Sequence, residues 1–199
     1  MMEIIRKVIK NPLSLAGSMI ILVFISIAIA APWLAPPIQG HSPYQIPRDG
    51  FSLVPKPPNG KHPFGTTEGQ YDIYYGVIWG TRTAFRVGII VTGSITLIGV
   101  VLGTIAGYYG GLADEIIMRI VDIFMAFPFL IAAMVVTVIL GKGLDKVMIA
   151  LIMFGWMGYA RLIRGSVLAA KEADYVQAAK AIGAGGLRVM FKHILPNTI

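Results

Sequence analysis

Long uncharged apolar runs alternate with short polar stretches along most of this chain. The first run, Leu13 to Ala31, has 19 residues, close to the ~20 that an α-helix needs to cross a bilayer. Further apolar runs cover residues 87–109, 116–140 and 147–168. The pattern therefore predicts an all-α polytopic membrane protein with about four transmembrane helices at these positions.

The first apolar run has a competing interpretation as a cleaved signal peptide. Arg6, Lys7 and Lys10 precede it, and the stretch 28–30 resembles a small-residue cleavage site. The run is nevertheless longer than the roughly 7 to 15 apolar residues of such a peptide. We favour a retained helix, so that residues 1–36 form a cytoplasmic tail and the first transmembrane helix.

The segment 32–83 has a different composition, rich in proline, glycine and polar residues. This composition disfavours long helices, and the segment holds no apolar run long enough to span a bilayer. We predict an extracytoplasmic loop over residues 37–83, followed by a transmembrane core over residues 84–199.

Small residues mark one side of the second span. Gly99, Gly103 and Gly107 form a doubled G-x-x-x-G pattern. Glycines four residues apart let another helix approach closely, and such packing drives helix association in lipid. We expect a tightly packed neighbour, either in this chain or in another subunit.

The third and fourth spans carry a proline and several charges. Pro128 is expected to kink the third span. Arg119 and Asp122 lie one helical turn apart near its beginning and are predicted to pair. Arg161 and Arg164 are predicted to snorkel toward the cytoplasm, where they end the buried part of the fourth span.

Composition agrees with a membrane protein. Hydrophobic residues make up 56% and charged residues 14% of the chain, against about 25% charged in soluble domains. The tail and the stretch 161–196 hold nine of the 17 Lys and Arg residues. The positive-inside rule then places the N-terminus in the cytoplasm, although Arg82 and Arg86 oppose this orientation. Because the net charge of +7 comes from such flanking residues, nucleic-acid binding is not predicted.

No catalytic or metal-binding pattern is evident. The chain has no Cys and no G-x-x-x-x-G-K-[ST] phosphate loop. His41, His62 and His193 lack the spacing of metal ligands and are assigned to turns or caps. We therefore predict no cofactor and no enzymatic activity in this chain.

The segment 169–196 is polar and helix-forming. Asp174 and Gln177 have the spacing of a capping box, and Gly183 stands where a left-handed helix end is expected. The helix between them is about two turns long and marginal without a partner. Its predicted apolar face, at i, i+3, i+4 and i+7, consists of Tyr175, Ala178, Ala179 and Ile182.

This segment resembles the cytoplasmic coupling loop of ABC-importer permeases, whose pattern is Glu-Ala-Ala, three residues, Gly, nine residues, Ile, one residue, Leu-Pro. The matching positions here are Ala178, Ala179, Gly183, Leu195 and Pro196. Gln177 stands where the pattern has Glu, and His193 stands where it has Ile. Residues 62–66 and 107–128 also resemble the C-type permease subunit of dipeptide, oligopeptide and nickel importers.

The resemblance implies a type I ABC-importer permease fold in the bacterial or archaeal cytoplasmic membrane. Such a subunit has six spans and supplies half of a pore, so a chain with four spans is expected to be truncated at its C-terminus. The implied partners are a second permease, cytoplasmic ATPase subunits that hydrolyse the ATP, an extracytoplasmic substrate-binding protein and membrane lipids. The residues implied in ATPase coupling are Asp174, Tyr175, Gln177, Ala178, Ala179, Ile182, Gly183, Leu195 and Pro196.

Two alternatives remain open from the residues alone. The protein could be a membrane scaffold that anchors a soluble partner without transport. The short helix could instead lie among lipid headgroups and bind anionic lipids through Lys171, Lys180, Arg188 and Lys192. An intramembrane enzyme is disfavoured, because the spans contain no catalytic constellation.

Overall fold

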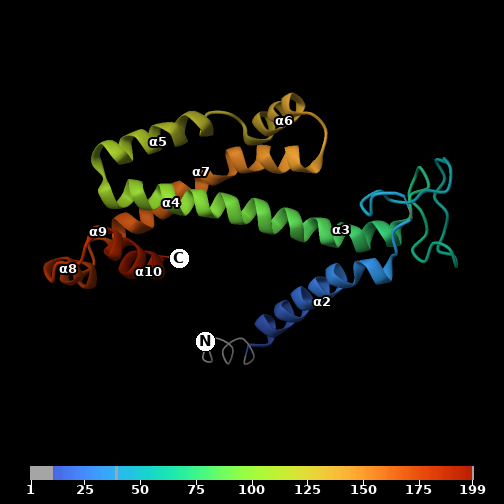
Figure 1. Ribbon diagram of the computed structural model, residues 1–199, viewed down its shortest axis with the longest axis horizontal. Coiled ribbons are helices and arrows are strands. Elements are labelled where there is room, and N and C mark those ends of the chain that lie inside the picture. The colour runs from blue at the N-terminus through green and yellow to red at the C-terminus, as the bar shows by residue number, and fades with distance from the viewer. Residues whose placement is uncertain (1–10, 39, 199) are drawn as a thin grey trace. The chain divides into compact units, whose positions relative to one another are not determined.

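The structure is a computed structural model that describes residues 11–38 and 40–198. Within these residues the chain is mainly helical, apart from a long loop between residues 34 and 73, and forms no β-strand, only two isolated bridges between loop residues. It divides between Arg86 and Val87 into two compact units, each described separately below. Figure 1 traces the order of the helices along the chain.

Helix α2 (Pro12–Leu34) contains the first predicted span. Asn11 caps it, because its side-chain oxygen accepts hydrogen bonds from the backbone of Leu13 at 3.0 Å and of Ser14 at 3.4 Å. Its 23 residues extend about 35 Å at 1.5 Å per residue, enough to cross the hydrocarbon core. The basic residues at positions 6, 7 and 10 lie outside the described residues.

Helix α3 (Ile73–Val87) begins inside the segment that the sequence assigns to a loop. The loop prediction is therefore wrong for residues 73–83. The Asp72 carboxylate caps this helix by accepting the Tyr75 backbone N–H at 2.9 Å. A π-helical turn η1 (Gly88–Thr92) and helix α4 (Gly93–Tyr109) continue it, giving a helical segment of 37 residues.

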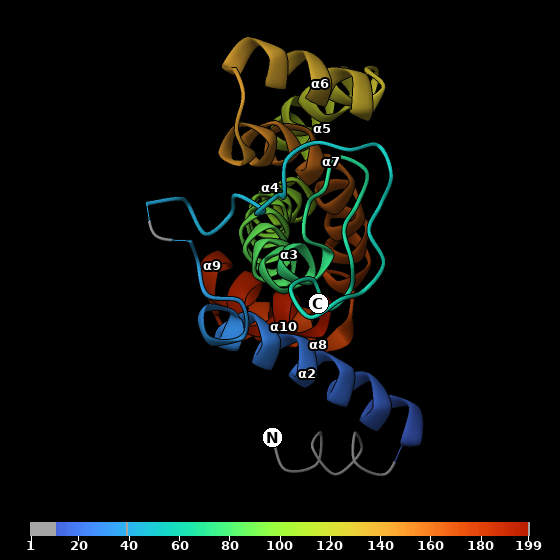
Figure 2. The same cartoon turned by 90° about the vertical axis from the view of Figure 1, so that its right-hand side faces the viewer.

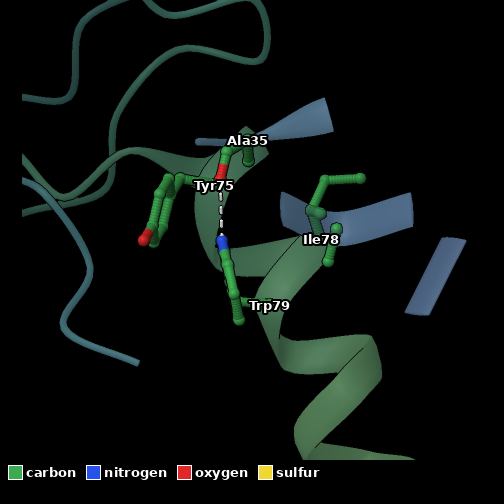
Figure 3. Close-up of a cluster of buried hydrophobic side chains, with 5 residues drawn as sticks. Ala35, Tyr75, Ile78 and Trp79 are labelled. Atoms are coloured by element: carbon green, nitrogen blue, oxygen red, sulfur yellow. Dashed lines mark hydrogen bonds between the residues drawn. The ribbon is translucent and has the colours of Figure 1, made fainter. Parts of the chain in front are cut away.

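The first unit has a small core between the end of α2 and the start of α3. Ala31, Ala35, Tyr75, Ile78 and Trp79 are all buried there. The Trp79 indole donates a hydrogen bond to the Ala35 carbonyl oxygen at 2.9 Å, so that its polar atom is satisfied within the apolar cluster (Figure 3). The signal for α3 was present in the sequence, because Tyr75, Ile78 and Trp79 are spaced i, i+3 and i+4.

A charged cluster orders the loop between α2 and α3. His62 is only 4% exposed; its Nδ1 lies 2.7 Å from an Asp72 oxygen and its Nε2 lies 3.0 Å from an Asp49 oxygen. Hydrogen bonds to Asp49 and Asp72 raise the pKa of His62 above its ordinary value. The His62 hydrogen bond, followed by that of Lys61, lowers the pKa of Asp49 from 3.8 to about 2. The cluster ties the loop to the cap of α3.

The second unit contains α4 and three further apolar helices, α5 (Gly111–Met125), α6 (Phe129–Leu140) and α7 (Leu144–Ala170). Gly110 and Gly111, with φ of 66° and 51°, form the reversal between α4 and α5. The axes of α5 and α6 differ by 83° at a break that contains Pro128. The predicted kink is therefore present, but it separates two helices.

In the part of the chain that the structure describes, three helices are long and apolar enough to cross a membrane, or up to four if the bent pair α5–α6 is one span. These are α2, the continuous segment 73–109 and α7. The prediction of an all-α polytopic membrane protein is confirmed.

Helices α4 and α7 pack side by side, as both views show (Figures 1 and 2). The three glycines of the G-x-x-x-G pattern lie at this contact. A methyl group at Gly103 would collide with the Ala160 carbonyl oxygen, and one at Gly107 would lie 2.9 Å from the Arg164 carbonyl oxygen. The closely packed neighbour of the second span is therefore in this chain.

Candidate functional site

Four short helical elements follow α7 at the end of the chain. They are α8 (Asp174–Ala181), α9 (Gly186–Arg188), a π-helical segment η2 (Val189–Ile194) and α10 (Leu195–Thr198). Figure 1 places α8 at the same end of the second unit as the reversal between α4 and α5.

The predicted capping box at the start of α8 is not formed. Ala173 occupies the N-cap position without a side-chain hydrogen bond, and Asp174 is the first helical residue. Gln177 is consequently one position too far along the helix, and its amide donates instead to the Lys171 carbonyl oxygen at 3.0 Å. Asp174 still places a negative charge in the first turn, where it interacts favourably with the helix dipole.

The other end of α8 has the hydrogen bonds of a Schellman motif. Gly183 has φ of 85° and its N–H donates to the Lys180 carbonyl oxygen at 2.9 Å. The Ala184 N–H donates to the Ala179 carbonyl oxygen at 3.0 Å. Both bonds satisfy carbonyl groups that would otherwise lack partners at the helix end. The helix is therefore stopped sharply after eight residues.

One side of α8 is fixed to the body of the second unit. Val176 is fully buried and Ala179 is 5% exposed. The apolar cluster around Val176 comprises Ile163, Val167, Val189 and Ile194. Sequence reasoning missed Val176, although its spacing of three residues from Ala179 indicated an inner face. Val176 and Ala179 therefore hold α8 through contacts within the chain.

A second side of α8 remains exposed. Tyr175 is 44% and Ile182 is 87% exposed, and Ala178 between them is also exposed. These three residues, spaced i, i+3 and i+7, form what we call the α8 ridge. The predicted apolar face is thus divided, because Ala179 belongs to the inner side. The α8 ridge is thus an exposed apolar strip that ends at Ile182, the C-cap residue of α8.

Leu195 and Pro196 lie apart from the α8 ridge. Pro196 is exposed, and Leu195 lines a hollow of about 240 Å³ together with α4 residues, among them Thr104. The hydroxyl group of Thr104 is buried there without a hydrogen-bond partner among the described residues. Ile194, rather than His193 or Leu195, packs against Val176.

Tyr108 connects α4 to the terminal elements. Its ring packs against the Gly186 backbone, where a methyl group would lie 3.2 Å from the phenolic oxygen. The Lys180 ammonium lies 5.8 Å from the centroid of the same ring. Lys171 donates to the Gly107 carbonyl oxygen at 3.4 Å. Two of the basic residues considered for lipid binding therefore make contacts within the protein.

The charges on the spans also pair differently from the sequence prediction. Asp122 accepts a hydrogen bond from Arg161 at 2.6 Å, and Arg119 is not its partner. Arg164 binds Asp114 through two nitrogen atoms. Both ion pairs join α5 to α7, because the packing of these helices brings together residues that are far apart in the sequence.

A second hollow, of about 370 Å³, lies open to the surface at the bend between α5 and α6. Its lining is entirely apolar and consists of Ile123, Phe124, Phe127, Pro128, Ile131, Ala132, Val135, Val136 and Phe154.

Comparison with protein families gives two matches, one at each end of the chain, and residues 59–98 lie between them. Residues 99–199 match the binding-protein-dependent transport system inner membrane component. The chain belongs to this family. Residues 1–58 match the N-terminal transmembrane domain of oligopeptide transport permease C. This inner-membrane component is therefore a multi-pass membrane protein of a permease family, as its apolar helices independently indicate.

Curated relatives align with nearly all of this inner-membrane component. The dipeptide transport system permease protein of Bacillus subtilis (strain 168) is 37% identical over 98% of this chain and 58% of its own length. The oligopeptide transport system permease protein of the same organism is 38% identical over 96% of this chain and 60% of its own length. The glutathione transport system permease protein of Pectobacterium atrosepticum is 33% identical over 99% of this chain and 64% of its own length. The chain thus spans about three fifths of these relatives.

Proposed function

We propose that this chain provides membrane-spanning helices of an ABC-importer permease and forms part of one half of its translocation pathway. The observation that carries the proposal is the α8 ridge on a helix that is fixed from behind by Val176 and Ala179. A short helix with one anchored side and one exposed side is suited to transmit movement from a soluble partner to the helices behind it. The family match supports the same assignment.

In this proposal the α8 ridge docks in a groove of a cytoplasmic ATPase subunit. ATP-driven closure of the ATPases then carries α8, and the apolar cluster around Val176 passes the movement to α7. The N-terminus and α8 accordingly lie on the cytoplasmic side. A second permease completes the pathway, and an extracytoplasmic binding protein delivers the substrate.

Small peptides are the proposed substrate class. The three relatives described above are named for dipeptide, oligopeptide and glutathione transport, and all of these solutes contain peptide bonds. The apolar hollow at the α5–α6 bend contains no polar side chain that would select among them.

The experiment measures ATP-dependent peptide uptake into proteoliposomes that contain the assembled importer. Ile182→Asp places a carboxylate in the docked ridge, and we expect uptake to fall by at least about tenfold, equivalent to about 1.4 kcal/mol of docking energy. Leu187→Asp is the matched control, because Leu187 is 65% exposed in α9 but lies outside the ridge. Equal uptake in the two variants would contradict docking through the ridge. ATPase binding without any ATP-dependent uptake in the parent importer would favour the scaffold alternative.

A further inference from the structure

Arg164 occupies the place where three helices of the second unit meet. From α7, its guanidinium group reaches the Asp114 carboxylate in the first turn of α5, and Nε and Nη2 bind separate oxygen atoms. Its backbone carbonyl faces Gly107 of α4, where a methyl group would lie 2.9 Å away. Arg164 therefore contacts α4 through its main chain and α5 through its side chain.

This ion pair is also close to the inner side of α8. Val167, one turn after Arg164, is fully buried in the cluster that contains Val176. The apolar cluster therefore links α8 to α7 through Val176 and Val167, and the ion pair links Arg164, one turn earlier on α7, to Asp114. From there, α5 leads to the bend at Pro128.

The second ion pair between the same helices has a different character. The side chains of Arg161 and Asp122 are 49% and 57% exposed, and a single nitrogen atom makes the contact. In the first pair, Arg164 and Asp114 are 32% and 19% exposed and bind through two nitrogen atoms. A bidentate, partly buried pair fixes the relative orientation of its two helices more firmly than an exposed single contact.

We propose that Asp114 and Arg164 form a positioning pair that transmits displacement of α8 to α5 and thereby to the α5–α6 bend. The proposal rests on the proposed function of α8 as the ATPase-docking helix. It assigns to this pair a role in coupling, separate from docking itself, because neither residue belongs to the α8 ridge.

The test separates docking from transmission in the assembled importer. Asp114→Asn removes the charge that holds Arg164, and Arg164→Lys keeps the charge but loses the planar two-point contact. For each variant we would measure co-purification of the ATPase subunits, ATP hydrolysis and peptide uptake in proteoliposomes. We expect ATPase binding and hydrolysis to persist while peptide transported per ATP falls by about tenfold, within the range of coupling energies between sites.

Two controls distinguish this role from simple stabilisation. The exchange of Asp114→Arg with Arg164→Asp should recover a substantial part of the peptide transported per ATP. The matched pair of changes on the same helices, Asp122→Asn and Arg161→Gln, should alter this ratio by less than about twofold.

Three results would overturn the proposal. One is an unchanged ratio in both Asp114→Asn and Arg164→Lys, and another is a parallel loss of ATPase binding, hydrolysis and uptake, which indicates a structural role only. The third is an equal effect of the Asp122 and Arg161 changes. Failure of the proposed function is recognised separately, because the parent importer would then neither bind ATPase subunits nor transport peptide.

Discussion

At the scale of single residues, the loop cluster around His62 makes the order of this loop depend on pH. Because the pKa of His62 is raised above 6.5, its imidazolium contributes stability that is fully present below about pH 6.5 and is lost as the pH rises through the raised value. Because the pKa of Asp49 is lowered from 3.8 to about 2, its contribution is present above pH 3.8 and is lost as the pH falls toward 2.

We therefore predict that amide hydrogen exchange in residues 40–72 accelerates as the pH rises above the His62 pKa, after correction for the intrinsic pH dependence of exchange. The physical reason is that a neutral imidazole can donate to only one of its two carboxylate neighbours. His62→Gln should remove this alkaline acceleration while raising exchange at lower pH. The same alkaline acceleration in His62→Gln and in the parent protein would show that another group is responsible.

Gly183 gives a second prediction at this scale. Its φ of 85° is unfavourable for a side chain, although nothing lies within 4 Å of the position that a Cβ atom would take. Gly183→Ala should therefore destabilise the end of α8 by about 1–2 kcal/mol through backbone strain alone. Hydrogen exchange at Ala184, whose N–H bonds to Ala179, should accelerate by about tenfold.

Gly185→Ala is the matched control, because Gly185 also has open space around it but has φ of −65°. This variant should leave exchange at Ala184 nearly unchanged. Equal acceleration in the two variants would mean that the left-handed backbone conformation at Gly183 does not stabilise the end of α8.

At the scale of elements, the contact between α4 and α7 depends on the absence of side chains at three positions. Gly103→Ala should force the helices apart, because the added methyl group meets the Ala160 backbone and lies 3.0 Å from the Ile163 Cβ atom. We expect a loss of about 1–3 kcal/mol, the usual cost of overpacking. It would be measured as a lower thermal unfolding midpoint of the purified importer in detergent.

Gly93→Ala on the same helix provides the comparison, since nothing lies within 4 Å of its added methyl group. Its unfolding midpoint should equal or exceed that of the parent, because alanine favours helix formation. A midpoint of Gly103→Ala as high as that of Gly93→Ala would contradict close packing of α4 on α7.

The elements also show how far sequence reasoning reached. The apolar runs predicted the spans because length and hydropathy are local properties. Pro128 predicted a kink for the same reason, and the structure has there a break between two helices, α5 and α6. The start of α3 was missed because the Pro- and Gly-rich loop extends close to Asp72, whose cap is visible only once the loop is folded. The end of α8 at Gly183 was predicted correctly, because a glycine in the left-handed conformation is a local signal. The start of α8 was predicted one residue too late, because Ala173 and not Asp174 is the N-cap residue.

The remaining differences between the predicted and the observed structure arise from contacts between residues that are far apart in the sequence. The partner of Asp122 was predicted to be Arg119, one turn away, but α5 packs beside α7 and Arg161 reaches it from 39 positions further along the chain. The inner side of α8 depends on α7, which precedes Val176 in sequence, and on η2, which follows it, so the burial of Val176 depends on residues from two other elements. The G-x-x-x-G pattern indicated a close neighbour but could not identify α7.

At the scale of the whole molecule, the proposed function requires α8 to be held to the transmembrane helices on one side and docked to the ATPase on the other. In the proposed function, the exposed α8 ridge contacts the ATPase subunit. Val176 and Ala179, on the buried side of α8, hold the helix to the transmembrane helices. Residues 1–199 contain no Cys, so a thiol introduced in this segment reports on one position of it.

The most direct measurement is site-specific cross-linking from Ile182→Cys in membranes that contain the assembled importer, with Leu187→Cys as the matched control. The account predicts that Ile182→Cys forms a cross-link to an ATPase subunit, that its yield changes with ATP, and that Leu187→Cys forms little. An Ile182→Cys thiol that labels only from the extracytoplasmic side, or that cross-links to no ATPase subunit under any nucleotide condition, would contradict the account.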